Sequence, residues 1–208
     1  MVNMETAVRY AVIIVLAYLL GSLNFSIIIS KLTLKKDIRD FGSGNAGSTN
    51  SLRVMGMKKT LLVILGDILK GVAAVLVAKP IMGDSFGQAA EILASISCVL
   101  GHTFPVFFGF RGGKGVLTTA AVVGCIDFRV CIIAVALFVT IVAISKFVSL
   151  GSIIAVWSVP VLFALFYGQS GVVYIAFGVL LAAFVTFLHR ANIKRLRTGT
   201  ENKLKFKK

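Results

Sequence analysis

The chain has 208 residues, of which 58% are hydrophobic and only 14% are charged. Water-soluble domains are closer to half apolar and a quarter charged, so this composition excludes an ordinary soluble fold and indicates a membrane protein. The net charge of +14 would suggest nucleic-acid binding in a soluble protein. In membrane proteins, however, Lys and Arg collect in cytoplasmic loops. Because the sequence contains no RNA- or DNA-binding motif, we expect no nucleic-acid partner.

Several apolar runs are long enough to cross a bilayer, which takes about 20 helical residues. The first run is too long for the apolar region of a signal peptide, and no small-residue cleavage site follows it, so we expect an uncleaved span. In chain order the runs are residues 8–29, 61–78, 92–108, 149–166 and 172–188.

Residues 116–145 are also apolar but too long for one simple span, and Gly124, Asp127 and Arg129 interrupt them. If they form a hairpin, 18 of the 22 Lys and Arg residues fall on one side of the membrane. A single crossing would move the basic C-terminal tail to the opposite side. The preference of basic residues for the cytoplasm therefore favours the hairpin.

These runs predict an all-α fold, a polytopic membrane helix bundle with seven transmembrane helical segments. The fourth and fifth segments are short. The N-terminus lies outside, the C-terminus is cytoplasmic, and residues 1–208 form a single integral membrane domain. The predicted cytoplasmic segments are residues 31–60, 109–115, 146–149 and 189–208.

The first cytoplasmic segment contains a run rich in glycine and asparagine, residues 42–50, followed by Arg53. Glycine permits positive φ and close backbone approach, so successive N–H groups can form a concavity that binds phosphate. The guanidinium of Arg53 matches a phosphate with two donors. The alternative is a flexible polar linker. The candidate phosphate-binding residues are Ser43, Gly44, Asn45, Gly47, Thr49, Asn50 and Arg53.

A second glycine-rich segment, residues 101–115, places Gly112, Gly113 and Lys114 just before an apolar helix that begins at Val116. A helix N-terminus favours anions. The segment is not a Walker A loop, because Phe108 stands where that motif needs glycine. Lys114 could instead be a charge that only sets topology. His102 in the same segment is either structural or part of a site.

The tail begins with His189 and Asn192, which share a face if the helix continues. An interfacial basic tail is the alternative, and it explains residues 203–208. Asp67 and Lys70 lie one turn apart inside the second span, where charges are costly. We expect a mutual ion pair, with contact between Lys70 and an anionic ligand as the lesser alternative.

Several chemistries lack their motifs in this sequence. There is no Gly-x-Ser-x-Gly nucleophile elbow, no His-x-x-x-x-Asp acyltransferase box and no His-Glu-x-x-His zinc motif. The cysteines, Cys98, Cys125 and Cys131, lie in apolar runs without metal-ligand spacing, so we expect buried hydrophobic residues. We therefore expect no metal and no cofactor.

Five segments, in order along nearly the whole chain, resemble the bacterial acyl-phosphate:glycerol-3-phosphate acyltransferase family. Three match long motifs: Ser-Gly-Asn-x-Gly-x-Thr-Asn-x-x-Arg; Gly-His-x-Phe-Pro-Val-Phe followed by Gly-Gly-Lys-Gly; and His-Arg-x-Asn-Ile-x-Arg-Leu-x-x-Gly-x-Glu. The shorter two are Tyr-Leu-Leu-Gly-Ser and Asp-x-x-Lys-Gly. They occupy residues 43–53, 101–115, 189–201, 18–22 and 67–71.

The resemblance implies a seven-helix enzyme that transfers a fatty acyl group from acyl phosphate to the sn-1 hydroxyl of glycerol 3-phosphate. The products are 1-acylglycerol 3-phosphate and phosphate, and neither CoA nor acyl carrier protein is used directly. The expected catalytic residues are Ser43, Arg53, Lys114, His189 and Asn192. The expected substrate-binding residues are Gly44, Asn45, Gly47, Thr49, Asn50, Lys70, His102, Gly112, Gly113 and Ser149.

Acyl phosphate is a mixed anhydride, so catalysis needs positioning and charge stabilisation rather than a covalent nucleophile. The hydroxyl proton would pass to the substrate phosphate or to His189. Expected partners are glycerol 3-phosphate, acyl phosphate, membrane lipid and the soluble enzyme that makes acyl phosphate. The expected location is the bacterial cytoplasmic (inner) membrane, with the site facing the cytoplasm.

Two other classes of protein could use some of these features. A transporter of acidic solutes would also need cationic loops, but transporters place polar residues at the midplane between inverted repeats. A purely structural membrane protein leaves the density of Gly, Asn and Arg unexplained.

Overall fold

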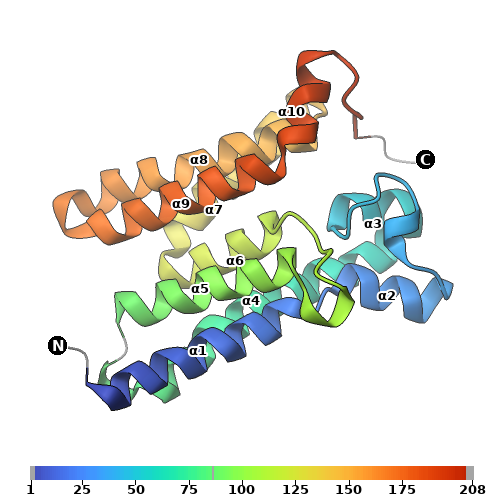
Figure 1. Cartoon of the computed structure of the whole chain (residues 1–208). Helices are drawn as coiled ribbons and strands as arrows, with labels where there is room; N and C mark the ends of the chain where they lie inside the picture. Colours follow the sequence, from blue (N-terminus) through green and yellow to red (C-terminus); the bar gives the residue numbers. More distant parts are fainter. Residues whose placement is uncertain (1–2, 86, 205–208) are drawn as a thin grey trace. The chain divides into compact units, whose positions relative to one another are not determined.

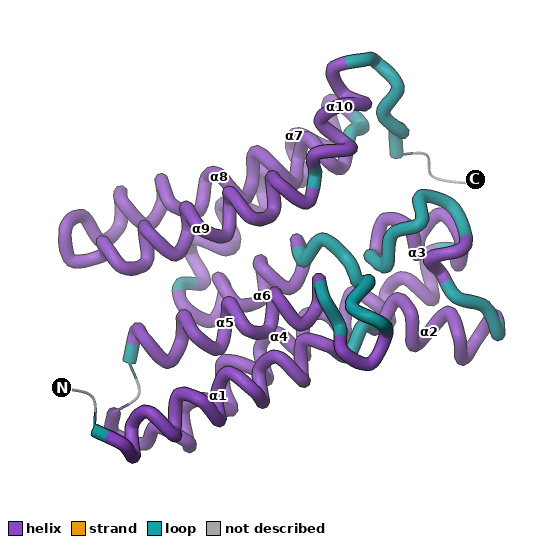
Figure 2. Tube along the Cα trace, in the orientation of Figure 1, coloured by secondary structure: helices purple, strands orange, loops and turns teal. Residues whose placement is uncertain are grey.

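The computed structural model describes residues 3–85 and 87–204, and within them all regular structure is helical (Figure 1). This confirms the predicted all-α class for the described part of the chain. The chain divides into two compact units, Met1–Ile126 and Asp127–Lys208. The helices and the turns that join them can be followed in Figure 2.

The first unit packs its long helices closely because small residues line their contacts. A Cβ added at Gly21 of α1 would lie 2.1 Å from the Cys98 carbonyl oxygen of α5. Such close approach of backbones is typical of membrane helices. The helices are α1 (Met4–Ser22), α2 (Phe25–Leu34), α3 (Ser48–Met55), α4 (Met57–Met82), α5 (Gln88–Thr103) and α6 (Val116–Ile126). The short 3-10 turns are η1 (Ile38–Asp40), η2 (Gly83–Ser85) and η3 (Val106–Phe108).

The first apolar run forms one candidate span, as predicted, but its helix is interrupted at Leu23 and Asn24. In a continuous helix the amide of Ile27 would donate to the Leu23 carbonyl. Here that amide donates to Asn24 Oδ1 (3.1 Å), and the Leu23 carbonyl accepts from Lys70 Nζ (2.9 Å). Both backbone groups are therefore satisfied without water, as an apolar environment requires.

The second unit is a row of three long helices that ends in a short one. Trp157 Nε1 of α8 donates to Thr186 Oγ1 of α9 (3.0 Å), and Gly178 packs against Pro160, so α8 and α9 run antiparallel. Asp127 caps α7, where its carboxylate accepts from the amide of Arg129. The elements are α7 (Phe128–Ser145), α8 (Val148–Tyr167), η4 (Gly168–Gly171), α9 (Val172–Leu188) and α10 (Arg190–Arg197).

Five segments of the described chain are long and apolar enough to cross a membrane. The interruption predicted near Asp127 is present, and α6 is short with 11 residues. The expectation that the following helix is also short is wrong, because α7 has 18 residues. The seven-segment threading and the direction of the termini stay predictions. The spans are Met4–Leu34, Met57–Met82, Gln88–Phe108, Phe128–Ser145 and Val148–Leu188, of which the last contains both α8 and α9.

Candidate functional site

The first glycine-rich segment is shaped from within by Asn50 of α3. Its Oδ1 accepts from the Ser43 amide (2.8 Å), and its Nδ2 donates to the carbonyls of Ile38 (3.2 Å) and Phe41 (3.0 Å). The amide of Gly44 also donates to the Phe41 carbonyl (3.1 Å). Two amides expected to face an anion are thus bound inside the segment, and Asn50 organises it.

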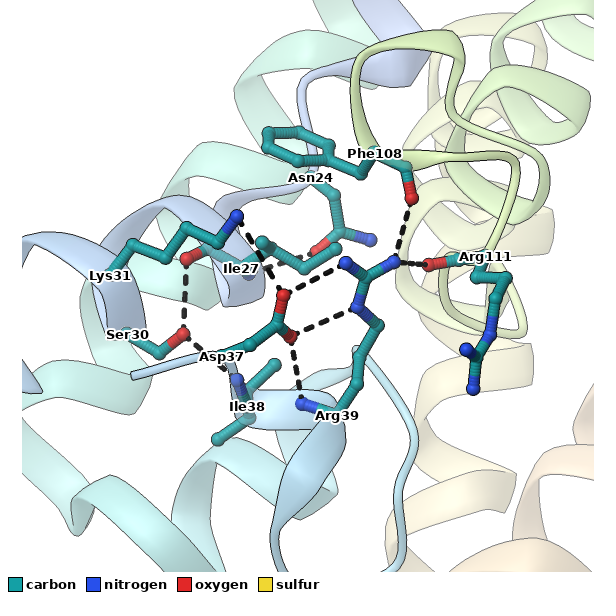
Figure 3. Close-up of polar contacts among 9 residues, drawn as sticks. All are labelled: Asn24, Ile27, Ser30, Lys31, Asp37, Ile38, Arg39, Phe108 and Arg111. Carbon is teal, nitrogen blue, oxygen red and sulfur yellow. Dashed lines mark hydrogen bonds and ion pairs between the residues drawn. The ribbon is translucent and has the colours of Figure 1, made fainter. Parts of the chain in front are cut away.

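Serine and asparagine side chains of α2 hold this segment in place. Ser30 Oγ accepts from the Ile38 amide (3.2 Å), and the hydroxyls of Ser26 and Ser51 lie 2.7 Å apart. Asn24, which caps α2, also donates through Nδ2 to the Ala46 carbonyl (3.2 Å). Figure 3 shows Asn24 and Ser30 on the α2 side of this region.

The side chains predicted to meet phosphate from this segment are accessible. Ser43 and Arg53 are exposed, whereas Asn45 and Thr49 are half-buried. Glycine is favoured at Gly44, because its φ of 71° lies in the left-handed region, where a side chain causes strain. With its backbone anchored to α2 and its polar side chains outward, the segment can offer hydroxyl and guanidinium donors to an anion.

The second glycine-rich segment lies against the end of α5 and against the first segment. The amides of Gly112 and Gly113 donate to the carbonyls of Thr103 (3.0 Å) and His102 (3.2 Å). A Cβ at Gly113 would lie 2.2 Å from His102 Nε2 and 2.6 Å from the Ala46 carbonyl oxygen. Glycine therefore allows the contact that brings the two segments side by side. Half-buried Lys114 follows directly.

A buried cluster of Asp67, Lys70 and His102 lies against the second segment, where His102 contacts Gly113. Lys70 Nζ lies 2.8 Å from Asp67 Oδ1, 2.9 Å from the Leu23 carbonyl oxygen and 2.8 Å from His102 Nδ1. An ammonium has three donors and no acceptor, so His102 accepts at Nδ1 and carries its hydrogen on Nε2. The predicted ion pair is present. Lys70 Nζ is held among these protein groups, and its contact with Asp67 Oδ1 is an ion pair without a hydrogen bond.

Glu201 organises the candidate residues of the second unit. One carboxylate oxygen accepts from Ser149 Oγ (2.8 Å) and Asn192 Nδ2 (2.6 Å), and the other accepts from Arg195 Nε (2.6 Å). Burial alone would raise the pKa of the Glu201 carboxyl. The hydrogen bonds from Asn192, Ser149 and Arg195 outweigh it, so the pKa lies below its ordinary value. The carboxylate is therefore charged at neutral pH.

His189 lies at the junction of α9 and α10, so one uninterrupted helix, the condition for a shared face with Asn192, is not present. The buried ring approaches the Val185 carbonyl oxygen with Nδ1 (2.8 Å). Because a carbonyl only accepts, Nδ1 carries a hydrogen, and in the neutral form of such a ring Nε2 is the nitrogen with the lone pair. Buried Asn192 follows on α10. The Val185 carbonyl thus orients the ring of this predicted proton acceptor.

The structure groups the predicted residues within each unit. In the first unit, the segment carrying Ser43 and Arg53 lies beside the one that leads to Lys114. In the second, Glu201 joins Ser149 to Asn192, close in sequence to His189. Sequence reasoning left Glu201 out of the site, although the last motif ends on it. No group of three His, Cys, Asp or Glu residues suited to a metal occurs in the described ranges.

Comparisons with known proteins show what this chain is similar to. A family model described as glycerol-3-phosphate acyltransferase matches residues 11–199. A glycerol-3-phosphate acyltransferase of Thermoanaerobacter pseudethanolicus is 45% identical over 94% of this chain and 96% of its own length. A crystal structure of PlsY (YgiH), an integral membrane glycerol 3-phosphate acyltransferase in its glycerol 3-phosphate form, aligns with a TM-score of 0.85. It is 37% identical, and the match covers 94% of this chain and 96% of PlsY. The lysophosphatidic acid form aligns with a TM-score of 0.82 at 36% identity, covering 94% and 95% of the two chains.

Proposed function

Because the chain belongs to the glycerol-3-phosphate acyltransferase family, we propose that it transfers a fatty acyl group from acyl phosphate to the sn-1 hydroxyl of glycerol 3-phosphate. The products are 1-acylglycerol 3-phosphate and inorganic phosphate. Residues 1–208 act as one membrane enzyme, since the family match extends through both compact units.

The observation that carries the proposal is the packing of two cationic, glycine-rich segments side by side in the first unit. Gly113 lies so close to the Ala46 carbonyl that no Cβ fits between them. Both substrates carry a phosphate, and both segments present a cationic side chain, Arg53 and Lys114. Guanidinium and ammonium groups are the side chains that bind phosphate most strongly.

The reaction needs no covalent enzyme intermediate. The sn-1 oxygen attacks the acyl carbonyl carbon, the C–O bond to phosphate breaks, and phosphate leaves with the bonding electrons. Arg53 and Lys114 stabilise the charge that develops on the phosphate and on the carbonyl oxygen, with Ser43 as a neutral donor. The hydroxyl proton passes either to a substrate phosphate oxygen or to His189 Nε2. Asn192 and Ser149 both donate to Glu201, which holds them in place. The apolar helices supply a slot for the acyl chain.

The same proposal gives the enzyme its place in the cell. The basic residues support an orientation with the glycine-rich segments and the C-terminus in the cytoplasm of a bacterium and the N-terminus outside. The donor then reaches the site from the cytoplasm, from a soluble enzyme that makes acyl phosphate. The product remains in the inner membrane for phospholipid synthesis.

Purified protein in detergent tests the reaction, with glycerol 3-phosphate and synthetic acyl phosphate as substrates. Release of phosphate together with acylglycerol phosphate supports the proposal. A transporter would form neither product in this detergent assay, which contains no sealed vesicles. No product with freshly made acyl phosphate would overturn the proposal, and equal rates with acyl-CoA or acyl carrier protein would overturn the choice of donor.

Two deoxy analogues test the position of acylation. The 2-deoxy analogue, 1,3-propanediol phosphate, keeps the hydroxyl at the sn-1 carbon and should be acylated. The 1-deoxy analogue, 1,2-propanediol 1-phosphate, has a methyl group where glycerol 3-phosphate has the sn-1 hydroxymethyl group and should not react. Acylation of the second analogue at a comparable rate would contradict sn-1 specificity.

A further inference from the structure

Arg39 on η1 stands just before the first glycine-rich segment and binds the backbone of the second. Its Nε and Nη2 donate to the two carboxylate oxygens of Asp37 (2.9 and 2.8 Å). Its Nη1 donates to the carbonyl oxygens of Phe108 (2.7 Å) and Arg111 (2.9 Å) (Figure 3). One guanidinium thus joins the chain just before the first segment to the backbone of the second.

The same bonds leave Arg39 little capacity for a ligand. A guanidinium has five N–H donors, and these contacts use Nε, Nη2 and both hydrogens of Nη1. The side chains of Arg39 and Asp37 are each only 17% exposed. The hydrogen bond from Arg39 lowers the pKa of Asp37 to about 2, so the carboxylate stays charged at any working pH. Arg39 is therefore placed to hold protein rather than substrate.

The backbone that Arg39 holds is strained. Gly109 and Phe110 both have left-handed φ values, 66° and 57°, and this region is disfavoured for a residue with a side chain. The Phe110 side chain is 57% exposed, so packing of its ring does not impose the conformation. The carbonyls of Phe108 and Arg111, on either side, are the ones bound to Arg39. Such strain persists only where neighbouring contacts enforce it.

This turn leads directly into Gly112, Gly113 and Lys114. A change at Phe110 therefore alters the contact of Gly113 with Ala46, and with it the position of Lys114 relative to the first segment. Misplacement by about 1 Å in a binding or reacting group is enough to cost activity severely.

We propose that Asp37 and Arg39 are positioning residues, a clamp that holds the two glycine-rich segments in register and so sets the affinity for glycerol 3-phosphate. The inference rests on the proposed function in one respect, that these segments bind the phosphate of that substrate. Asp37 acts by orienting Arg39, and Arg39 acts through two backbone carbonyls.

The test is Arg39→Lys, which keeps the charge but removes the planar fork that binds a carboxylate and two carbonyls together. We expect KM for glycerol 3-phosphate, and Kd from equilibrium dialysis with labelled substrate, to rise about tenfold, with kcat within about threefold. Hydrogen exchange at the amides of residues 106–114 should become faster. A generally destabilised protein would show faster exchange throughout instead.

Three further variants sharpen the test. Lys36→Gln removes an exposed charge from the same connection and should leave KM and exchange as in the wild type. The double variant Asp37→Asn/Arg39→Lys should bind glycerol 3-phosphate no more weakly than Arg39→Lys alone, because both changes break the same Asp37–Arg39 interaction. Phe110→Gly in the Arg39→Lys background should recover part of the affinity, since glycine adopts the turn without strain.

Unchanged exchange and unchanged affinity in Arg39→Lys would overturn the clamp. Faster exchange at unchanged affinity would overturn its positioning role, and no recovery with Phe110→Gly would exclude the strained turn as the route. If Arg39→Lys does not fold, Asp37→Asn alone should show the same rise in KM and Kd for glycerol 3-phosphate and the same faster exchange at residues 106–114. A wild-type protein that neither binds nor acylates glycerol 3-phosphate refutes the proposed function, while exchange in Arg39→Lys still decides whether the clamp holds the turn.

Discussion

The ring of His189 is held by the last turn of α9, because Nδ1 donates to the carbonyl of Val185 four residues earlier. The ring therefore has a fixed tautomer and a fixed direction before any substrate binds. A neutral imidazole oriented in this way is suited to accept a proton at Nε2.

The first prediction concerns His189→Ala. A positioned general base contributes about 10²–10⁴ in rate, so kcat should fall by about 100-fold or more while KM for glycerol 3-phosphate changes little. Steady-state kinetics with both substrates measures the two constants. Arg190→Gln, next along the chain and exposed, is the control. Near-normal kcat in His189→Ala would assign the proton to the substrate phosphate.

A second prediction at this scale concerns Glu201 and acid. The pKa of this carboxyl is lower in the folded protein than its ordinary value of 4.5. The stabilisation of the folded protein by the charged Glu201 carboxylate is therefore full above pH 4.5. It is lost as the pH falls through the pKa of Glu201 in the folded protein. Hydrogen bonds to a charged group are worth about 1.5–3 kcal/mol each, so Glu201→Gln should lower Tm at pH 7 by about 5 °C.

Thermal unfolding in detergent at pH 7 and pH 4 measures this effect. The wild type should lose stability between the two values, and Glu201→Gln should lose less. Glu5→Gln is a suitable control, since Glu5 forms only an exposed pair with Arg9. An identical pH response in Glu201→Gln and wild type would contradict the assignment.

At the scale of helices and loops, the polar contacts of the candidate site lie in the loops that connect the helices. The ends of the helices set the positions of these loops. Much of this could be predicted from the sequence: the apolar runs, the break near Asp127 and the three motif segments. The break at Asn24 was hidden, because it lies inside an apolar run and its partner Lys70 is 46 residues further on in the chain. Helix α3 was missed because glycine and asparagine mask its short pattern. The role of Asp37 and Arg39 could not be predicted from the sequence, because Arg39 binds backbone carbonyls of residues far away in the chain.

Gly113→Ala tests the packing of the two glycine-rich segments. The new Cβ would meet His102 Nε2 and the Ala46 carbonyl, and overpacking of this kind costs about 1–3 kcal/mol. We expect activity to fall at least tenfold, mainly through KM for glycerol 3-phosphate. Gly87→Ala is the matched control, because a Cβ there meets nothing within 4 Å. Equal activity of the two variants would show that the segments need no such contact.

The whole molecule presents apolar side chains along its long helices, such as Leu65, Leu76 and Leu165, which are 54%, 58% and 73% exposed. Surfaces of this kind need lipid around them. Charge then decides which way the chain is inserted.

The orientation can be tested with single cysteines at the two ends. Met4→Cys should react with a membrane-impermeant maleimide on intact spheroplasts, and Asn202→Cys should react only after permeabilisation. Both positions are exposed. The unsubstituted chain, which contains Cys98, Cys125 and Cys131, gives the background. Labelling of Asn202→Cys on intact spheroplasts would reverse the proposed insertion.

The interrupted first span also has an evolutionary consequence. The Leu23 carbonyl has exchanged its helical partner for the ammonium of Lys70, and the Ile27 amide has exchanged its own for Asn24. A descendant that loses only Lys70 exposes a carbonyl to hydrocarbon, and one that loses only Asn24 does the same to an amide. Neither single change is tolerated well, whereas restoring a straight helix requires both. We therefore expect these two positions to vary together among related sequences.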